Sequence, residues 1–115
     1  MIYSQVMQEQ NKVYIKVDGY VSNSDIKGFI RDYKTQIKGI KTNKFNLVIE
    51  PNTFECENEA DIKNVCMMFY KTGYRKIYLV DPNNYIMSNI KLSGLEKKMF
   101  LSVVKIVKSP GEIRK

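Results

Sequence analysis

The stretch that decides the fold runs over residues 45–70 and reads FNLVIEPNTFECENEADIKNVCMMFY. Its first part, Phe45–Glu50, is an apolar run of a length suited to a central strand buried on both faces. An acidic segment follows and leads directly into a helix, for which Asn58 is a plausible N-cap and Gly73 a plausible end. The apolar positions of this helix share one side: Ile62, Val65, Cys66 and Phe69. Strand, loop and helix in this order predict a parallel α/β arrangement, in which binding usually takes place at the carboxyl ends of strands.

The chain before this stretch is expected to form a hairpin followed by a helix. Ile2–Met7 alternates weakly between apolar and polar residues and Lys12–Val17 alternates clearly, so we expect two paired strands. Asp18-Gly19 is a poor pair for a strand interior and predicts a bend or bulge. Ser22 and Asp25 then have capping-box spacing. The helix that they start has apolar residues at helical intervals: Ile26, Phe29, Ile30, Tyr33, Ile37 and Ile40.

The chain after this stretch is expected to add a strand, a helix and then a segment that could be either a strand or a helix. Lys76–Val80 is a short apolar strand, and Asp81-Pro82-Asn83 stops it and begins a third helix that runs towards Gly94. The last apolar segment, Met99–Val107, alternates like a strand, but its valines and lysines also fit a final helix.

The predicted order is therefore β-β-α-β-α-β-α with a final strand or helix. Alternation of this kind predicts an α/β fold with a small mixed, mostly parallel sheet and right-handed crossovers. We expect residues 1–108 to form a single domain and residues 109–115 to form a short charged C-terminal tail. A length of 115 residues is near that of one ordinary domain.

The composition excludes several classes of protein. The chain has no histidine, and its two cysteines do not have Cys-x-x-Cys spacing. The residues needed for a zinc site or a histidine acid/base pair are therefore missing, and we expect neither metal nor cofactor. The cysteines are expected to be reduced. No run of about 18 apolar residues and no signal-peptide pattern is present, so we expect a cytoplasmic protein that does not bind membranes.

One segment stands out by charge. Five acids lie within twelve residues that contain no lysine or arginine, on a chain whose net charge is +7: Glu50, Glu55, Glu57, Glu59 and Asp61. A segment of fixed negative charge predicts a constitutive acidic docking loop for a partner protein. The simpler interpretation is that Glu59 and Asp61 offset the helix dipole while the other acids are only solvated.

The candidate docking residues are those at the centre of this segment: Glu55, Cys56, Glu57, Asn58 and Glu59. Cys56 is a poor candidate for a nucleophile, because its neighbours Glu55 and Glu57 should raise the pKa of its thiol and suppress the thiolate. Acids confined to one loop are also poorly placed for a glycosidase-like pair, which needs two carboxyl groups facing across a cleft. We therefore expect no enzymatic activity.

Two alternatives stay open. The charge of +7 and seven tyrosines with neighbouring lysines would suit a basic surface that binds single-stranded nucleic acid: Tyr3, Tyr14, Tyr20, Tyr70, Tyr74, Tyr78 and Tyr85. We do not expect nucleic acid as the main partner, because the lysines are spread over nearly every element. The other alternative is a self-associating domain, in which Ile2–Met7 pairs at a sheet edge and Met67, Met68 and Met87 add contact surface.

The order of the elements resembles the STAS domain of bacterial anti-sigma factor antagonists. The resemblance extends from about Val13 to about Val104 and includes the VxG turn at Val17 and Gly19, LVIE before the loop, and KIYLVDPN before the third helix. Ile90–Leu95 is similar to the closing helix of that family and its Gly-Leu turn.

The resemblance implies a regulatory binding module without enzymatic activity, whose loop before the second helix docks on an anti-sigma factor or a kinase-like regulator. Phosphorylatable members carry an Asp-Ser-Ser-Gly-like run in that loop. Here the corresponding residues are Cys56-Glu57-Asn58-Glu59, and Thr53 lies too early, so no serine or threonine stands at the acceptor position.

Overall fold

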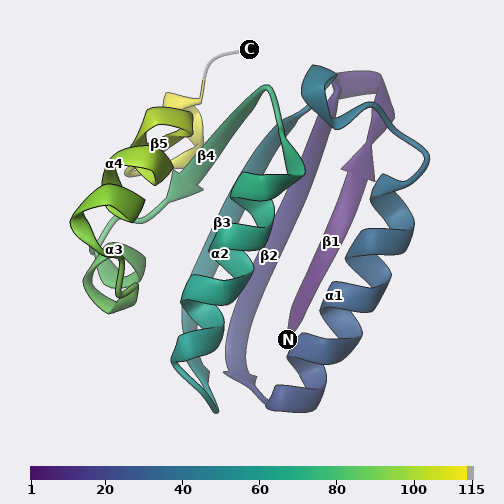
Figure 1. The fold of residues 1–115 in the computed structure, drawn as a ribbon. Coiled ribbons are helices and arrows are strands. Elements are labelled where there is room, and N and C mark those ends of the chain that lie inside the picture. The colour runs from purple at the N-terminus through teal and green to yellow at the C-terminus, as the bar shows by residue number, and fades with distance from the viewer. Residues whose placement is uncertain (114–115) are drawn as a thin grey trace.

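A computed structural model describes residues 1–113 as one mixed sheet with helices (Figure 1). Within these residues the strands are β1 (Ile2–Met7), β2 (Lys12–Val21), β3 (Asn46–Cys56), β4 (Lys76–Val80) and β5 (Val104–Val107). The helices are α1 (Asn23–Ile37), α2 (Ala60–Thr72), α3 (Tyr85–Asn89) and α4 (Gly94–Val103). The strands follow one another in the sheet in chain order, with β1 antiparallel to β2 and every later pair parallel. The predicted α/β fold with a mostly parallel sheet is confirmed.

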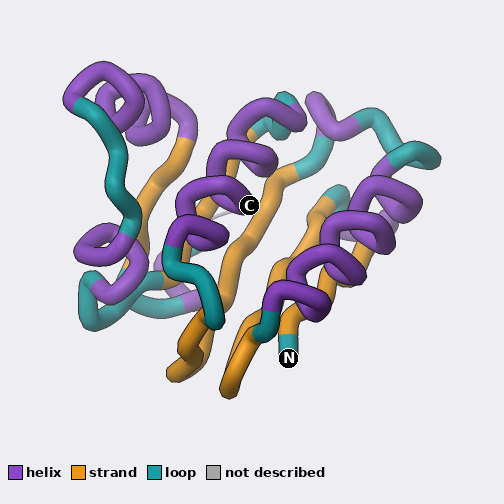
Figure 2. The backbone as a smooth tube through the Cα atoms, turned by 60° about the horizontal axis from the view of Figure 1, so that its bottom comes forward, coloured by secondary structure: helices purple, strands orange, loops and turns teal. Residues whose placement is uncertain are grey.

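Helices α1 and α2 cover one face of the sheet (Figure 2), and the main core lies between them and the strands. Alternate residues of the strands, such as Ile15, Leu47 and Leu79, meet the apolar sides of all four α-helices there in a single buried cluster. The predicted inward positions of α2 are all buried: Ile62, Val65, Cys66 and Phe69. A smaller cluster on the opposite face contains Val48, Tyr78, Val80 and Val107. Within the described part of the chain, no helix is long and apolar enough to cross a membrane.

A bulge allows β2 and β3 to stay paired over their whole lengths. The register shifts at the predicted place, between Val17 and Gly19, and Gly19 has a φ of 65°. The extra residue, however, belongs to β3, where Asn52 and Thr53 lie opposite Asp18 alone. Beyond the bulge, Tyr20 and Val21 pair with Glu55 and Cys56. Helix α1 begins directly after this, with the predicted capping box between Ser22 and Asp25.

The prediction that the central strand ends at Glu50 was wrong, because β3 continues through Pro51 to Cys56. Proline lacks an N–H group and is normally excluded from the middle of a sheet. Here the pairing of β3 with β4 ends at Ile49, so the strand has only β2 as a neighbour from Pro51 onwards. Pro51 therefore occupies an edge position inside a long strand.

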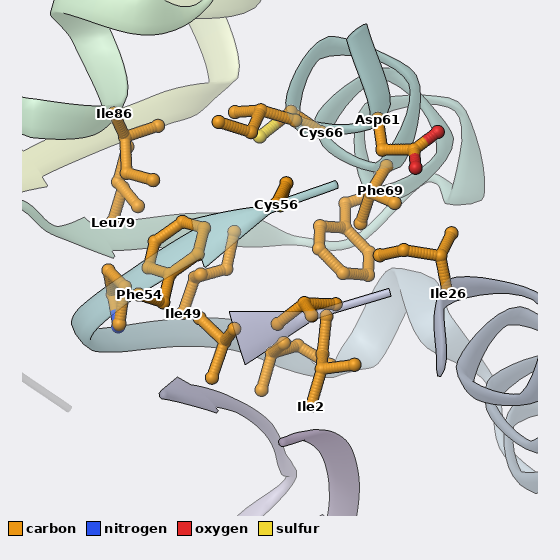
Figure 3. A pocket seen from close by; sticks show the side chains of 16 residues that line it. Ile2, Ile26, Ile49, Phe54, Cys56, Asp61, Cys66, Phe69, Leu79 and Ile86 are labelled. Atoms are coloured by element: carbon orange, nitrogen blue, oxygen red, sulfur yellow. The ribbon is translucent and has the colours of Figure 1, made fainter. Parts of the chain in front are cut away.

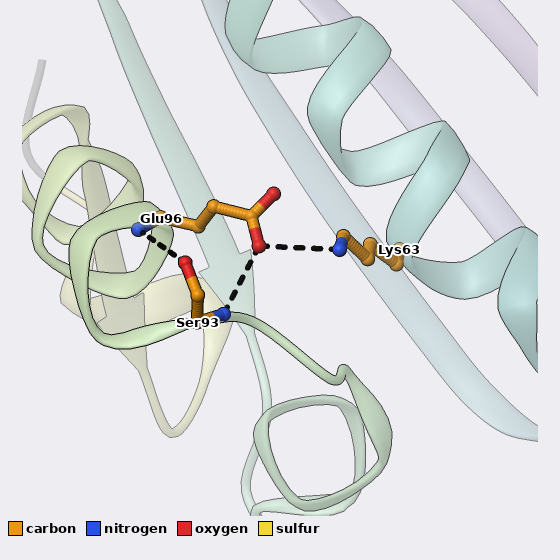
Figure 4. Close-up of polar contacts among 3 residues, drawn as sticks. All are labelled: Lys63, Ser93 and Glu96. Atoms are coloured by element: carbon orange, nitrogen blue, oxygen red, sulfur yellow. Dashed lines mark hydrogen bonds and ion pairs between the residues drawn. The ribbon is translucent and has the colours of Figure 1, made fainter.

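The carboxyl-terminal part also differs from the prediction. Gly94 does not end a helix but begins α4, while the preceding helix, α3, is short and ends at Asn89. Ser93 caps α4 in a capping box with Glu96, whose Oε1 atom also lies 3.2 Å from the Nζ atom of Lys63 in α2 (Figure 4). These bonds lower the pKa of Glu96, chiefly through the backbone N–H of Ser93.

The final apolar segment is both helix and strand. Met99–Val103 completes α4, and Val104–Val107 forms β5 parallel to β4. In the expected tail, residues 109–113, a turn of 3-10 helix covers Pro110–Glu112 and Ile113 packs against the smaller cluster. Residues 114–115 of that tail lie outside the described residues.

A buried chain of hydroxyl groups joins α1 to the end of α2 and the start of β4. The Tyr33 oxygen lies 2.6 Å from the Tyr74 oxygen and 3.0 Å from the Thr72 Oγ1 atom. Because the Thr72 hydroxyl donates to the Met68 carbonyl, Tyr33 donates to Thr72 and accepts from Tyr74. Burial raises the pKa of both tyrosines. The Tyr33 ring also packs edge-on against Phe69, with ring centroids 5.3 Å apart.

This direction of the hydroxyl chain predicts unequal effects of two conservative substitutions. Tyr33→Phe leaves the Tyr74 hydroxyl buried without a partner and should lower the free energy of unfolding by about 1–3 kcal/mol. Tyr74→Phe leaves Tyr33 bonded to Thr72 and should cost less, about 0.5–1.5 kcal/mol. Urea unfolding of the two variants measures the difference, and a larger loss for Tyr74→Phe would contradict this hydrogen-bond order.

Candidate functional site

The five predicted docking residues lie where the carboxyl end of β3 meets the start of α2 (Figure 1). Glu55 and Cys56 are the last residues of β3, and Glu57, Asn58 and Glu59 connect it to α2. The connecting loop is therefore shorter than the sequence indicated. Strand alternation sends the side chains of Glu55 and Cys56 to opposite sides. Cys56 faces the core beside Phe54, whereas Glu55 is exposed beside Tyr20 of β2.

Glu57 makes a contact with the start of α1 that could not be predicted from the sequence. Its Oε1 atom accepts a hydrogen bond from the Asn23 backbone N–H at 3.0 Å, and its Oε2 atom accepts one from the Asn23 side-chain amide at 3.0 Å. The Glu57 N–H in turn donates to the Val21 carbonyl at 2.9 Å. Glu57 thus places a negative charge at the N-terminus of α1, where the helix dipole favours it.

The contact of Glu57 with α1 predicts a loss of stability on substitution. Glu57→Ala should lower the free energy of unfolding by about 1 kcal/mol, as for the loss of a helix cap. Glu57→Gln keeps an acceptor oxygen and should lose less. Glu55→Ala is the matched control and should stay within about 0.5 kcal/mol of the wild type, since Glu55 has no such contact. Equal stability of Glu57→Ala and Glu55→Ala in urea would contradict the capping role.

The remaining acids are also separated. The N-cap of α2 is Glu59 and not Asn58 as predicted, although the Asn58 Oδ1 atom accepts a hydrogen bond from the Ala60 N–H at 3.1 Å. Glu59 stands exposed at the start of α2, and Asp61 is half-buried beside the apolar core. Glu50 lies well back in β3, opposite Lys16 of β2. Only Glu55 and Glu59 therefore remain as exposed acids without a described hydrogen bond or ion pair in this segment.

Two exposed tyrosines complete this surface. Tyr20 is 60% exposed and pairs in register with Glu55. Tyr85, the first residue of α3, is 40% exposed and packs edge-on against Phe54, with ring centroids 5.3 Å apart. Burial raises the pKa of Tyr85, and the nearby Cys56, Glu59 and Glu55 raise it further. We call the four exposed side chains, Tyr20, Glu55, Glu59 and Tyr85, the tyrosine–glutamate tip.

Tyr85 reaches this surface although β4 ends well before β3. The pairing of β4 with β3 stops at Ile49, and residues 81–84 then carry the chain along β3, so that Tyr85 packs against Phe54. Of the other tyrosines considered for a stacking surface, Tyr74 and Tyr78 are buried. The methionines considered for self-association, Met67, Met68 and Met87, are half-buried against the core.

An apolar cavity lies behind the tip, between the sheet and the helices (Figure 3). Its walls include Ile26 of α1, Phe69 of α2 and Ile86 of α3, with Cys56 and Asp61 among its few polar residues. Its volume of about 50 Å³ is well below the roughly 150 Å³ of a cavity that holds benzene. The cavity therefore has no room for a substrate of ordinary size.

Asp81 and the other buried polar side chains already have hydrogen-bond partners. The buried carboxylate of Asp81 accepts hydrogen bonds from the Ile86 and Met87 backbone N–H groups, both at 3.1 Å. No buried side-chain oxygen or nitrogen among residues 1–113 lacks a hydrogen-bond partner. Over the same residues, no three side chains of histidine, cysteine, aspartate or glutamate gather in a way that could hold a metal ion.

Both cysteines are free, and their surroundings disfavour the thiolate. Burial raises the pKa of Cys66 to about 12. The pKa of Cys56 is raised chiefly by burial and further by Asp61 and Glu59. The direction agrees with the prediction, but the responsible acids are not Glu55 and Glu57. Glu55 points to the other side of the strand, and Glu57 turns towards α1.

The raised pKa values predict slow alkylation. At pH 7.5 Cys56 should react with iodoacetamide several-fold more slowly than free cysteine, and its rate should rise as the pH increases towards 9. Cys66 should stay unmodified until the protein unfolds in urea, where both thiols react alike. Mass spectrometry of tryptic peptides follows each site, and a Cys56 faster than free cysteine would indicate an activated thiol instead.

Comparison with known proteins supports the fold alone. No family model matches the sequence, and no curated protein matches it either. Among solved structures, the chain is similar to an uncharacterised protein of the DUF3478 family with a SpoIIAA-like fold from Shewanella loihica PV-4. The TM-score is 0.55 at 11% sequence identity, over 97% of this chain and 88% of that one. The chain therefore has a SpoIIAA-like fold, in agreement with the fold implied by its resemblance to the STAS domain.

Proposed function

We propose that this protein is a non-enzymatic regulatory module that binds a partner protein through the tyrosine–glutamate tip. The observation that carries the proposal is that two exposed tyrosines and two exposed glutamates lie around the carboxyl ends of β2 and β3: Tyr20 pairs with Glu55, and Tyr85 lies near Glu55 and Glu59. Surfaces in this position vary freely over a rigid sheet, and fold alone does not determine their function.

The composition of the tip suits protein recognition. Tyrosine is enriched in interfaces, because its ring buries a large rigid area while its hydroxyl stays hydrogen-bonded. Glu55 and Glu59 would orient a partner that presents lysine or arginine side chains around an apolar patch. In phosphorylatable STAS domains a modified serine supplies negative charge in this loop, and here the glutamates would supply it permanently.

The chemistry of the surroundings supports a role without catalysis. The cavity behind the tip is too small for a substrate, and the pKa values of both thiols are raised. The buried Asp81 already caps the start of α3 with both carboxylate oxygens. By its resemblance to the STAS domain, the expected partner is an anti-sigma factor or a kinase-like regulator.

Charge reversal at the tip tests the proposal. In a pull-down from host lysate, the Glu55→Lys/Glu59→Lys variant should lose the specific protein partner about tenfold or more, as expected for charges that face a complementary surface. Glu57 is left unchanged, because its contact with Asn23 supports α1. The charge control is Glu9→Lys, an exposed residue in the turn between β1 and β2, which should retain the partner.

The experiment is run at moderate and high salt, after circular dichroism has established that each variant is folded. Equal capture by the wild type and the tip variant would refute docking at the tip. Recovery of nucleic acid that washes off with salt would favour the basic-surface alternative, and recovery of this chain alone would favour self-association.

A further inference from the structure

The sheet has a free edge at β1. Met1 and Asp18 exchange both backbone hydrogen bonds. In an antiparallel pair such residues alternate, so Tyr3 and Gln5 direct their backbone groups towards β2. The N–H and C=O groups of the residues between, Ile2, Ser4 and Val6, point away from the sheet. Among residues 1–113, no backbone group is bonded to them from that side.

This edge lacks the features that normally prevent another strand from pairing with it. The six residues of β1 read IYSQVM and contain no charge and no proline, and their pairing with β2 is regular. Natural edge strands are usually protected by such features. The opposite edge, β5, has only four residues and carries Lys105.

Helix α1 turns this edge into a groove. The helix packs against β1, and a hollow of about 390 Å³ lies between them. One face of α1 forms its wall, with Ser24, Asp25, Gly28, Asp32 and Gln36. Gly28 leaves this wall open, because a Cβ atom there would meet only the Arg31 guanidinium, at 3.8 Å. The side chains of Ser4 and Gln36 are hydrogen-bonded and join the two walls.

The groove carries more negative than positive charge. Asp25 and Asp32 are exposed along it. The Met1 ammonium group also borders the groove, but it is paired with Asp18, whose Oδ1 atom lies 3.4 Å away. Hydrogen bonds from Ser22 lower the pKa of Asp25, and the N-terminal ammonium lowers it further, so its carboxylate is charged at neutral pH. Asp32 lies 3.4 Å from the Nε atom of Arg31, but both side chains are mostly exposed and the pair is weak.

We propose that the β1–α1 groove binds an extended basic peptide segment of a partner protein, which adds to the sheet as a sixth strand beside β1. The backbone groups of Ile2, Ser4 and Val6 would supply the hydrogen bonds, and alternate basic side chains of the peptide would face Asp25 and Asp32. This site is separate from the tyrosine–glutamate tip and does not depend on it.

Synthetic peptides test strand addition directly. A fluorescent Lys-Thr repeat of eight residues should bind the full chain in an anisotropy titration, and a Glu-Thr repeat should bind at least tenfold more weakly. Two further peptides carry N-methyl groups on their backbone amides. In the first peptide every lysine amide is methylated, and in the second every threonine amide is methylated. Successive backbone N–H groups of a strand point to opposite sides, so only the lysine amides or only the threonine amides can face β1. The peptide in which the facing amides are methylated should therefore lose at least tenfold in affinity. If both bind like the parent peptide, attraction is by charge alone and the proposal is wrong.

Variants of α1 locate the peptide. Gly28→Leu should weaken binding at least tenfold by filling the groove, whereas Gly28→Ala is the matched control and should stay within about threefold, since both raise helix propensity. Asp32→Asn should weaken binding several-fold. With the Lys-Thr peptide bound, the amides of Ile2, Ser4 and Val6 should gain protection from hydrogen exchange.

Further outcomes would also overturn the proposal. The first is no binding, or equal binding by Gly28→Leu and Gly28→Ala. The second is a tenfold loss in the Glu55→Lys/Glu59→Lys variant, which would place the peptide at the tip. The third is a dimer of the free protein, seen by light scattering and dissociated by Gly28→Leu, because a second copy of the chain would then occupy the edge.

Discussion

The parallel pairing of β2 with β3 positions almost everything else in this molecule. Opposite Asp18, β3 carries one extra residue in the pair Asn52 and Thr53, and after this bulge the two strands end together at Val21 and Cys56. Helices α1 and α2 therefore begin side by side, and Glu57 joins them through its two hydrogen bonds to Asn23. Without the bulge, regular alternation from Pro51 would turn Phe54 and Cys56 away from the core and Glu55 towards it.

Features that depend on residues close together in the chain could be predicted from the sequence, and features that depend on distant segments could not. Features set by neighbours were predictable, including the capping box of Ser22 with Asp25, the irregular pairing at Asp18-Gly19 and the left-handed Gly73 after α2. One local signal was overlooked, because Ser93 and Glu96 have the same capping-box spacing and mark the start of α4.

The features that sequence reasoning missed depend on contacts between distant segments. Pro51 was taken as the end of a strand, but it is tolerated because β4 is already too short to pair with it. The five acids looked like one cluster along the chain, yet strand alternation and the contact with Asn23 leave only Glu55 and Glu59 at the tip. Tyr85 could be placed there only once the order of the strands was known.

The charge distribution constrains how either proposed surface can work. The chain carries a net charge of +7, while the charged side chains of the tip are acidic and negative charges outnumber positive ones around the β1–α1 groove. At a distance, a basic partner is repelled by the net charge. Only within about 8 Å, the screening length at physiological salt, does the partner experience mainly the local acids.

Salt weakens both the repulsion and the attraction, so affinity for a basic protein should vary little with salt. Nucleic acid, in contrast, is attracted by the net charge and releases counterions on binding, so its affinity falls steeply as salt increases. The salt dependence of binding therefore separates recognition by these acidic surfaces from binding by the basic remainder of the protein.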